Sequence, residues 1–119
     1  MGCIGSDEYA NKLKESMQSY GVKGIYQIDE ATPTGTCACL IDNKERSLVA
    51  NISAANNFKI DFLRENWASV EACKFYYSAG FFLTVGPDCM IEIGKHCEAE
   101  GKECMMNLSA PFLIQFFKD

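Results

Sequence analysis

The stretch KFYYSAGFFLTVGPD at residues 74–88 decides the fold class of this chain. Its apolar run, residues 74–85, is typical of a buried strand, and Pro87 is favoured at the first position of a helix. The pattern then repeats, because KECMMNLSA (102–110) predicts a second buried strand and PFLIQFFKD (111–119) predicts another helix. Strands that alternate with helices indicate βαβ units around a parallel sheet. We therefore predict an α/β fold.

The N-terminal half continues the same alternation. Residues 6–20 predict a helix that Ser6 caps and Gly21 ends, and GIYQID (24–29) predicts a short strand. Residues 62–72 predict a further helix. The side chains that we expect to face inward from the helices are Tyr9, Leu13, Met17, Tyr20, Trp67, Val70, Met90, Ile93 and Cys97.

A predicted hairpin interrupts this alternation. TGTCACLID (34–42) and RSLVANI (46–52) are strand-like runs, and the polar residues between them, 42–45, predict a turn. Since the hairpin falls between βαβ segments, we expect it to lie outside the parallel sheet as a flap or lid over residues 33–56, approximately.

One face of the hairpin combines a cation with apolar groups. Alternation along the second strand puts Arg46, Leu48, Ala50 and Ile52 on the same side. Such a surface is suited to cover an apolar ring and to reach a phosphate. The alternative is that Arg46 is a solvated turn residue, and the pattern alone favours that alternative.

The cysteines and the single histidine form no recognisable metal-binding or catalytic motif. Cys37 and Cys39 share a face of the first hairpin strand, but two thiols alone do not complete a tetrahedral metal site, so we expect no metal there. His96 is the one histidine, and we expect it on a helix surface. The single histidine gives no basis for a Ser/His/Asp triad, and no G-x-x-x-x-G-K phosphate loop is present. Seven cysteines without a C-x-x-C pair predict reduced thiols that mostly fill the core: Cys3, Cys37, Cys39, Cys73, Cys89, Cys97 and Cys104.

Composition and charge narrow the class of protein. The chain has 119 residues, of which 48% are hydrophobic and 23% charged, as in ordinary globular domains. The net charge of −5 argues against nucleic acid and anionic membranes as partners. No apolar stretch approaches the length of a membrane span, and no signal peptide is visible at the start. We expect a cytoplasmic location, with the nucleus as a second compartment.

Two predicted strand ends are candidates for a ligand site, because α/β sheets bind ligands beyond the carboxyl ends of their strands. SAGFF (78–82) and NLSAPF (107–112) both lead from an apolar strand through small residues to an aromatic side chain. Small residues let a ligand approach the backbone, and the rings of Phe81 and Phe112 offer stacking faces for a flat base. The alternative is that both rings are core, and spacing alone favours the core.

The first nine residues, MGCIGSDEY, have two incompatible interpretations. As an N-terminus, Met1-Gly2-x-x-x-Ser6 fits the myristoylation pattern, and Cys3 offers a second lipid site. As an internal segment, the same residues are a strand end, a glycine turn and a helix start.

Several segments together resemble the ribokinase-like family of carbohydrate kinases, and within it the branch that phosphorylates adenosine. The resemblance covers essentially the whole chain, and PTGTC, AGFFLTV and NLSAPF are its most specific motifs. One departure is Gly86, where the family usually has Ser, which removes a helix cap. The segments that carry the resemblance are GCIGSDEY (2–9), PTGTCACLI (33–41), ERSLVANISAANNF (45–58), ENWASVEACKFYYSAGFFLTV (65–85) and MMNLSAPFLIQFF (105–117).

The resemblance implies a partial ribokinase-like βαβ sandwich with a small hairpin lid, and a central position for residues 1–119 within a longer kinase domain. It favours the internal reading of the first residues. It also implies transfer of the γ-phosphoryl group of ATP to the 5′-hydroxyl of adenosine, with Mg²⁺, by a monomeric enzyme of purine salvage. Arg46 would stabilise the transferring phosphoryl group as the catalytic residue. The residues that would bind adenosine are Cys37, Leu48, Ala50, Ile52, Phe81 and Phe112.

The motifs that this family uses for the ribose and for the catalytic aspartate do not occur in these 119 residues. We therefore expect the chain alone to be inactive. Three alternatives remain at the level of sequence: a kinase of the same fold for another nucleoside or sugar, a module that binds nucleosides without catalysis, and a lipidated interaction module.

Overall fold

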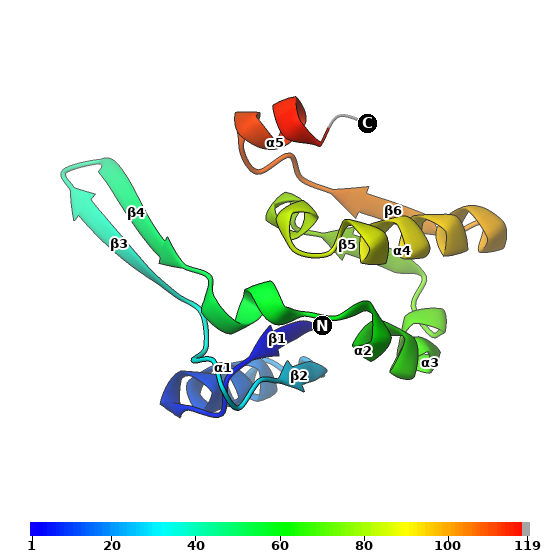
Figure 1. Ribbon diagram of the computed structural model, residues 1–119, viewed down its shortest axis with the longest axis horizontal. Coiled ribbons are helices and arrows are strands. Elements are labelled where there is room, and N and C mark those ends of the chain that lie inside the picture. The colour runs from blue at the N-terminus through cyan, green and yellow to red at the C-terminus, as the bar shows by residue number, and fades with distance from the viewer. Residues whose placement is uncertain (118–119) are drawn as a thin grey trace. The chain divides into compact units, whose positions relative to one another are not determined.

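The computed structural model describes residues 1–117 of the chain. The chain divides into two compact units, Met1–Phe58 and Lys59–Asp119, and each is described by itself (Figure 1). The part of the predicted helix 111–119 that falls on Lys118 and Asp119 lies outside the described residues.

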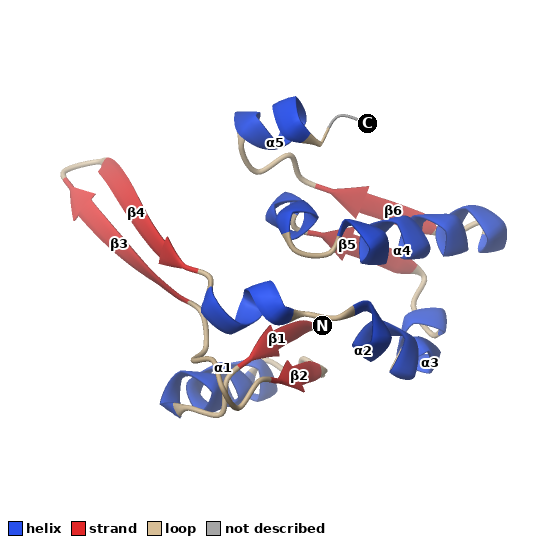
Figure 2. Cartoon of the chain, viewed as in Figure 1, coloured by secondary structure: helices blue, strands red, loops and turns tan. Residues whose placement is uncertain are grey.

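The first unit begins with a βαβ element. Strand β1 (Gly2–Ile4), helix α1 (Glu8–Ser19) and strand β2 (Tyr26–Ile28) follow one another, and β2 pairs with β1 in parallel (Figure 2). The predicted helix and strand are confirmed, and the first residues form a strand, a turn and the start of a helix. Gly21, which follows α1, has a left-handed backbone with φ 68°. Such a backbone ends a helix at little cost only in glycine.

Two details of α1 differ from the prediction. Its cap is Asp7, whose Oδ1 accepts a hydrogen bond from the backbone N–H of Ala10 at 2.9 Å, whereas Ser6 is exposed. The expected inward stripe is wrong for this unit, because Tyr9 and Tyr20 are exposed and Ala10 is the buried residue of the helix. A carboxylate also suits the positive end of the helix dipole better than a hydroxyl does.

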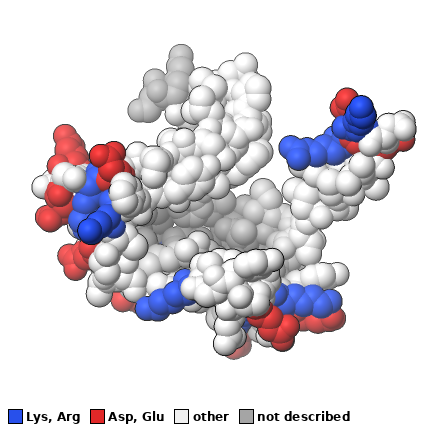
Figure 3. Space-filling view, turned by 180° about the vertical axis from the view of Figure 1, so that it is seen from behind, with Lys and Arg blue, Asp and Glu red and all other residues white. Residues whose placement is uncertain are grey.

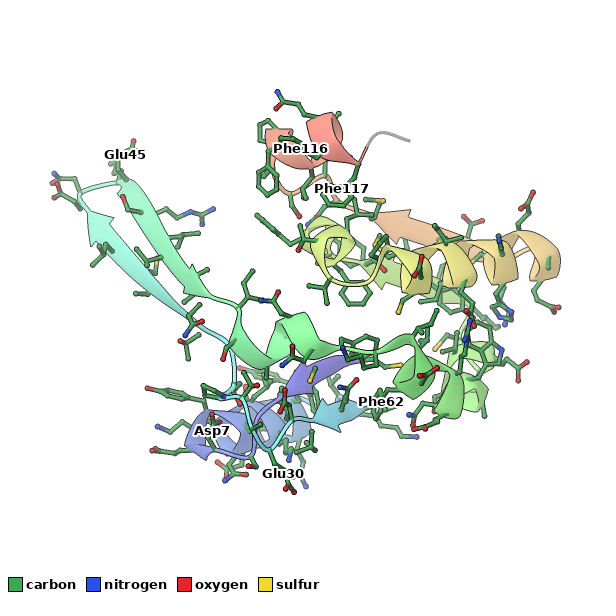
Figure 4. The ribbon with its side chains drawn as sticks, viewed as in Figure 1. Asp7, Glu30, Glu45, Phe62, Phe116 and Phe117 are labelled. Atoms are coloured by element: carbon green, nitrogen blue, oxygen red, sulfur yellow. The ribbon has the colours of Figure 1, made fainter. Side chains whose placement is uncertain are left out.

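The Asp7 carboxylate joins the start of α1 to the segment that leads into the hairpin (Figure 4). Its Oδ1 accepts from Thr34 Oγ1 at 2.7 Å, and its Oδ2 accepts from the Thr34 backbone N–H at 2.7 Å. Thr34 is buried, and its Oγ1 accepts from the Gly5 N–H at 3.0 Å. A Cβ on Gly5 would lie 2.7 Å from Thr32 O, so only glycine permits this approach.

A second group of hydrogen bonds fixes the other arm of the hairpin base. Helix η1 (Ser53–Asn57) follows the hairpin, and Asn57 Nδ2 donates to Asp29 Oδ2 at 2.6 Å. The Ser53 hydroxyl and the Ala54 N–H both donate to Pro33 O, at 2.6 and 3.0 Å. Both ends of the hairpin are therefore tied to the same unit.

The hairpin is confirmed as a separate antiparallel pair. It consists of β3 (Thr36–Asp42) and β4 (Glu45–Asn51), and every residue of both strands is exposed. Asn43 in the two-residue turn has φ 55°, a conformation that Asn tolerates better than most residues. Within its unit the hairpin extends away from β1, β2 and α1 (Figure 1).

The second unit contains the other parallel pair. Strand β5 (Phe75–Ser78) pairs in parallel with β6 (Glu103–Met106), with Ser78 opposite Met106. The chain between them forms η2 (Gly80–Thr84) and α4 (Pro87–Glu100). The predicted βαβ pattern is confirmed, and Pro87 begins α4 as expected; its N-cap, Gly86, makes no side-chain capping bond. The remaining helices of the unit are α2 (Ile60–Glu65), α3 (Trp67–Glu71) and α5 (Pro111–Phe116).

Three predictions for this unit are wrong in detail. The strand predicted over 74–85 ends at Ser78, because the chain turns into the 3-10 helix η2 at Gly80. The helix predicted over 62–72 is two short helices divided at Asn66, whose Nδ2 donates to Phe62 O at 2.8 Å. Strand β6 is exposed along its length among the described residues, although its sequence is apolar.

We predict that Thr34→Val destabilises the full-length protein by about 1–3 kcal/mol, because it leaves the Gly5 N–H without its acceptor. The free energy of unfolding, from denaturant titration followed by circular dichroism, measures this. Thr36→Val is the matched control, since Thr36 is exposed on β3, and we expect it to change stability by less than about 0.5 kcal/mol.

The same variant has a pH signature. Hydrogen bonds from the Thr34 side chain and backbone lower the pKa of Asp7 below 3.8, its ordinary value. The contribution of a carboxyl with a lowered folded pKa is present above its unfolded pKa and lost as pH falls through the folded one. Below pH 3.8 the wild type should therefore lose stability more steeply than Thr34→Val. Equal slopes would show that the hydrogen bond from the Thr34 hydroxyl to Asp7 contributes nothing.

Candidate functional site

The hairpin register places most of the predicted lid residues on one face. In the ladder, Cys37 lies opposite Ala50, Cys39 opposite Leu48, and Ile41 opposite Arg46. Residues directly opposite each other in an antiparallel pair share a face of the sheet. This face therefore carries small and apolar side chains along its length and the guanidinium near its tip.

Strand alternation does not place Ile52 on this face of the hairpin, contrary to the prediction from the sequence. Ile52 lies beyond the end of β4, and its backbone is helical, with φ −71° and ψ −37°. The period of two therefore ends at Asn51, and strand alternation does not assign Ile52 to the face of Leu48 and Ala50.

Charged residues gather at the tip of the hairpin (Figure 3). They are Asp42, Lys44, Glu45 and Arg46, and all four are exposed. Figure 4 labels Glu45 at this tip. Among the described residues, Arg46 forms no ion pair, so its charge is available to an anionic ligand.

The second unit brings Phe81 and Phe112 together. Their ring centroids are 5.9 Å apart with planes tilted by 57°, an ordinary geometry for an aromatic pair. Phe81 is 48% exposed and Phe112 is 42% exposed, so in the described chain the two rings are not core residues. Their faces are accessible for stacking at the carboxyl ends of β5 and β6.

Two polar residues that sequence reasoning missed hold these strand ends together. Asn107 Oδ1 accepts from the Gly80 N–H at 2.7 Å and from the Ser109 hydroxyl at 2.6 Å. Ser109 Oγ in turn accepts from the Phe81 N–H at 3.2 Å. The sequence signal for these contacts was a Gly-Phe pair after one strand together with an Asn-x-Ser sequence after the next strand.

His96 is not a simple surface residue. Its ring meets Trp67 edge-on at 5.2 Å and Tyr76 at 6.0 Å, and Lys102 Nζ lies 3.2 Å from its Nε2. Lys102 also donates to Glu71 O at 2.7 Å. This cluster joins α3, β5, α4 and the chain before β6, and its contacts are those of a packing role.

The cysteines are free thiols, as expected, but most of them are not core residues. Cys3, Cys89 and Cys97 are buried, whereas the other four are exposed: Cys37, Cys39, Cys73 and Cys104. Burial raises the pKa of the Cys89 and Cys97 thiols, which lowers their reactivity further.

An apolar groove of about 560 Å³ lies beside β6 in the second unit. Residues from β5, η2, α4, β6 and α5 line it, among them Ser78, Leu83, Met90, Met105 and Phe116. Phe116 and Phe117 belong to the C-terminal end of the described chain (Figure 4). Among the described residues, those that line the groove carry no charge, so they offer a ligand mainly apolar contact area.

Within residues 1–117, no group of three or more His, Cys, Asp or Glu side chains is arranged to hold a metal ion. In the same residues, no helix has the length and apolar character needed to cross a membrane.

Two parallel βαβ units and an exposed antiparallel hairpin with an arginine near its tip match the partial α/β sandwich with a hairpin that the resemblance implies. The family model described as pfkB family carbohydrate kinase matches residues 1–119. The chain therefore belongs to this family.

The relatives with high identity are adenosine kinases. The chain is 51% identical over 121 residues to adenosine kinase 2 of Arabidopsis thaliana, covering 100% of this chain and 35% of that protein. It is 49% identical over 120 residues to adenosine kinase of Dictyostelium discoideum, with coverages of 99% and 35%. The chain thus spans about a third of the length of the curated relatives that it matches.

Solved structures agree with these sequence matches. The crystal structure of Anopheles gambiae adenosine kinase in complex with P1,P4-di(adenosine-5) tetraphosphate superposes with a TM-score of 0.94 at 46% identity. It covers 98% of this chain, which corresponds to 35% of that chain. Adenosine kinase from Schistosoma mansoni in complex with adenosine, in an occluded loop conformation, gives 0.92 at 33% identity, with coverages of 98% and 34%. The predicted fold class, a partial ribokinase-like α/β fold, is confirmed.

We predict that Cys3, Cys89 and Cys97 stay unmodified when the folded full-length protein is treated with a maleimide, because all three are at most 4% exposed. Peptide mass spectrometry after labelling with and without denaturant measures this. All seven cysteines of residues 1–119 should react in denaturant. Labelling of Cys89 as fast as Cys73 in the folded protein would contradict the burial described here.

Proposed function

We propose that the full-length protein transfers the γ-phosphoryl group of ATP to the 5′-hydroxyl of adenosine and so acts in purine salvage. The observation that carries this proposal is 49–51% identity to adenosine kinases along the whole chain. Two similar structures are complexes with adenosine or with an adenosine-containing nucleotide, which supports the same substrate class.

The hairpin is suited to act as a lid over the nucleoside. Its Cys37, Leu48 and Ala50 side would cover the apolar part of the ligand, with Ile52 at the base of the lid. All strand residues of the hairpin are exposed, and an isolated two-stranded hairpin is only marginally stable, so covering a ligand would also stabilise it. Closing a lid excludes water and limits wasteful hydrolysis of ATP.

Arg46 would stabilise the transferring phosphoryl group. Phosphoryl transfer depends mainly on positioning and on neutralising charge, and the planar guanidinium can contact two phosphate oxygens at once. Phe81 and Phe112 would flank the adenine, since their faces are half-exposed at the strand ends.

Mg²⁺ and ATP belong to the proposal as partners of the full-length protein. Mg²⁺ prefers oxygen ligands, and it commonly bridges the phosphates in kinases. The described residues contain no cluster suited to hold it, so we assign Mg²⁺ no ligand in this chain.

We also propose a cytoplasmic monomer, with the nucleus as a second compartment, that binds neither nucleic acid nor membranes. The net charge of −5 supports the last two points, because a basic surface is what anionic polymers and membranes attract.

The substrate is tested by comparing adenosine, inosine and ribose as acceptors for the full-length protein with ATP. We expect kcat/KM for adenosine to exceed that for inosine and ribose by at least about 100-fold, which corresponds to about 2.7 kcal/mol of transition-state binding. Chromatographic measurement of the monophosphate products decides it. Equal rates for adenosine and ribose would favour a general sugar kinase, and no phosphorylation at all would favour a binding module.

We predict that Arg46→Ala lowers kcat for adenosine by about 100-fold or more while changing KM by less than about threefold, because Arg46 would act on charge in the transition state. Steady-state kinetics measures both constants. Lys44→Ala is the matched control, since it removes a cation from the same tip. An unchanged turnover number in Arg46→Ala would refute the role of this arginine.

A further inference from the structure

The ends of β5 and β6 are joined by four residues that we name the strand-end cluster: Gly80, Phe81, Asn107 and Ser109. Two consecutive backbone N–H groups, those of Gly80 and Phe81, donate to side chains that come from 27 and 28 residues further along the chain. The first N–H groups of a helix have no partner within it, so Asn107 and Ser109 satisfy the free donors at the start of η2.

The two strand ends approach each other at backbone distance. A Cβ on Gly80 would lie 2.3 Å from Asn107 O and 2.9 Å from Ser109 Oγ, which no larger residue tolerates. Ser109 has a left-handed backbone with φ 52°, and Ala110 N–H donates to Leu108 O at 2.5 Å, which closes a tight turn. Strained backbone persists where its surroundings determine it, and it concentrates at functional sites.

The strand-end cluster is adjacent in sequence to both rings of the aromatic pair. Phe81 is itself a member, and Phe112 follows Ser109 by three residues at the start of α5. The cluster therefore fixes the backbone from which each ring projects, while the rings themselves stay half-exposed with their centroids 5.9 Å apart.

We propose that Asn107 and Ser109 are positioning residues that set the spacing of Phe81 and Phe112 for a planar nucleobase. This inference rests on the proposed function, because it concerns how the nucleoside is held. The residues act through the two rings and not on the reacting phosphoryl group. Their loss therefore weakens nucleoside binding and leaves the chemical step unchanged.

The experiment uses the full-length protein and the variants Asn107→Ala, Asn107→Asp and Ser109→Ala. Leu108→Ala is the matched control, because Leu108 lies in the same loop and is 61% exposed. Hydrogen exchange of the Gly80 and Phe81 amides reports on the cluster without any ligand. Steady-state kinetics with adenosine then separates KM from kcat.

We expect Asn107→Ala to speed exchange at both amides and to raise KM for adenosine about tenfold, with kcat within about twofold of the wild type. Ser109→Ala should expose the Phe81 amide with a smaller rise in KM, and it serves if Asn107→Ala does not fold. Asn107→Asp keeps the acceptor oxygen, so it should retain slow exchange and a KM close to that of the wild type.

Two results would overturn the positioning role. One is faster exchange in Asn107→Ala with an unchanged KM. The other is an Asn107→Asp variant with protected amides and a KM as high as that of Asn107→Ala, which would show direct contact between Asn107 and the nucleoside. A wild-type protein that does not phosphorylate adenosine would instead overturn the proposed function, and it is recognised before any variant is compared.

Discussion

Each unit depends on the same kind of contact at the end of a parallel strand. A glycine there donates its backbone N–H to a polar side chain from a loop later in the chain. In the first unit, Gly5 follows β1 and donates to Thr34 Oγ1. In the second, Gly80 comes shortly after β5 and donates to Asn107 Oδ1. A Cβ at either glycine would meet backbone atoms at less than 3 Å. A strand end packed this closely needs both a residue without a side chain and a partner for its N–H group.

These two contacts place the parts that the proposed chemistry needs. Thr34 lies two residues before β3, so its contact with Gly5 and Asp7 determines where the hairpin begins. Asn107 stands between β6 and α5, so its contact with Gly80 determines where the two phenylalanine rings emerge. In both units the exposed group is attached to a closely packed backbone contact, which is the usual way for a scaffold to present functional loops.

Sequence reasoning succeeded where the signal is local. The helix start at Pro87, the glycine after α1 and the hairpin turn within residues 42–45 all depend on local backbone preferences, and each is present. Sequence reasoning failed where the local structure involves contacts with residues far along the chain. The apolar run 74–85 is equally compatible with one long strand or with a strand and a 3-10 turn. In the structure, the start of the 3-10 turn donates hydrogen bonds to the side chains of Asn107 and Ser109, which lie almost thirty residues away.

For the candidate site, the sequence by itself determined that Arg46, Leu48 and Ala50 share one face of the hairpin, because a strand period of two follows from the chain alone. It also determined the family resemblance that points to a nucleoside kinase. Only the tertiary structure decided that Asp7 and not Ser6 caps α1, that Phe81 and Phe112 meet with half-exposed rings, and that Asn107 and Ser109 join the strand ends. The physical reason is that hydrogen bonds and ring contacts between distant segments depend on distances through space, and the order of residues along the chain does not contain those distances.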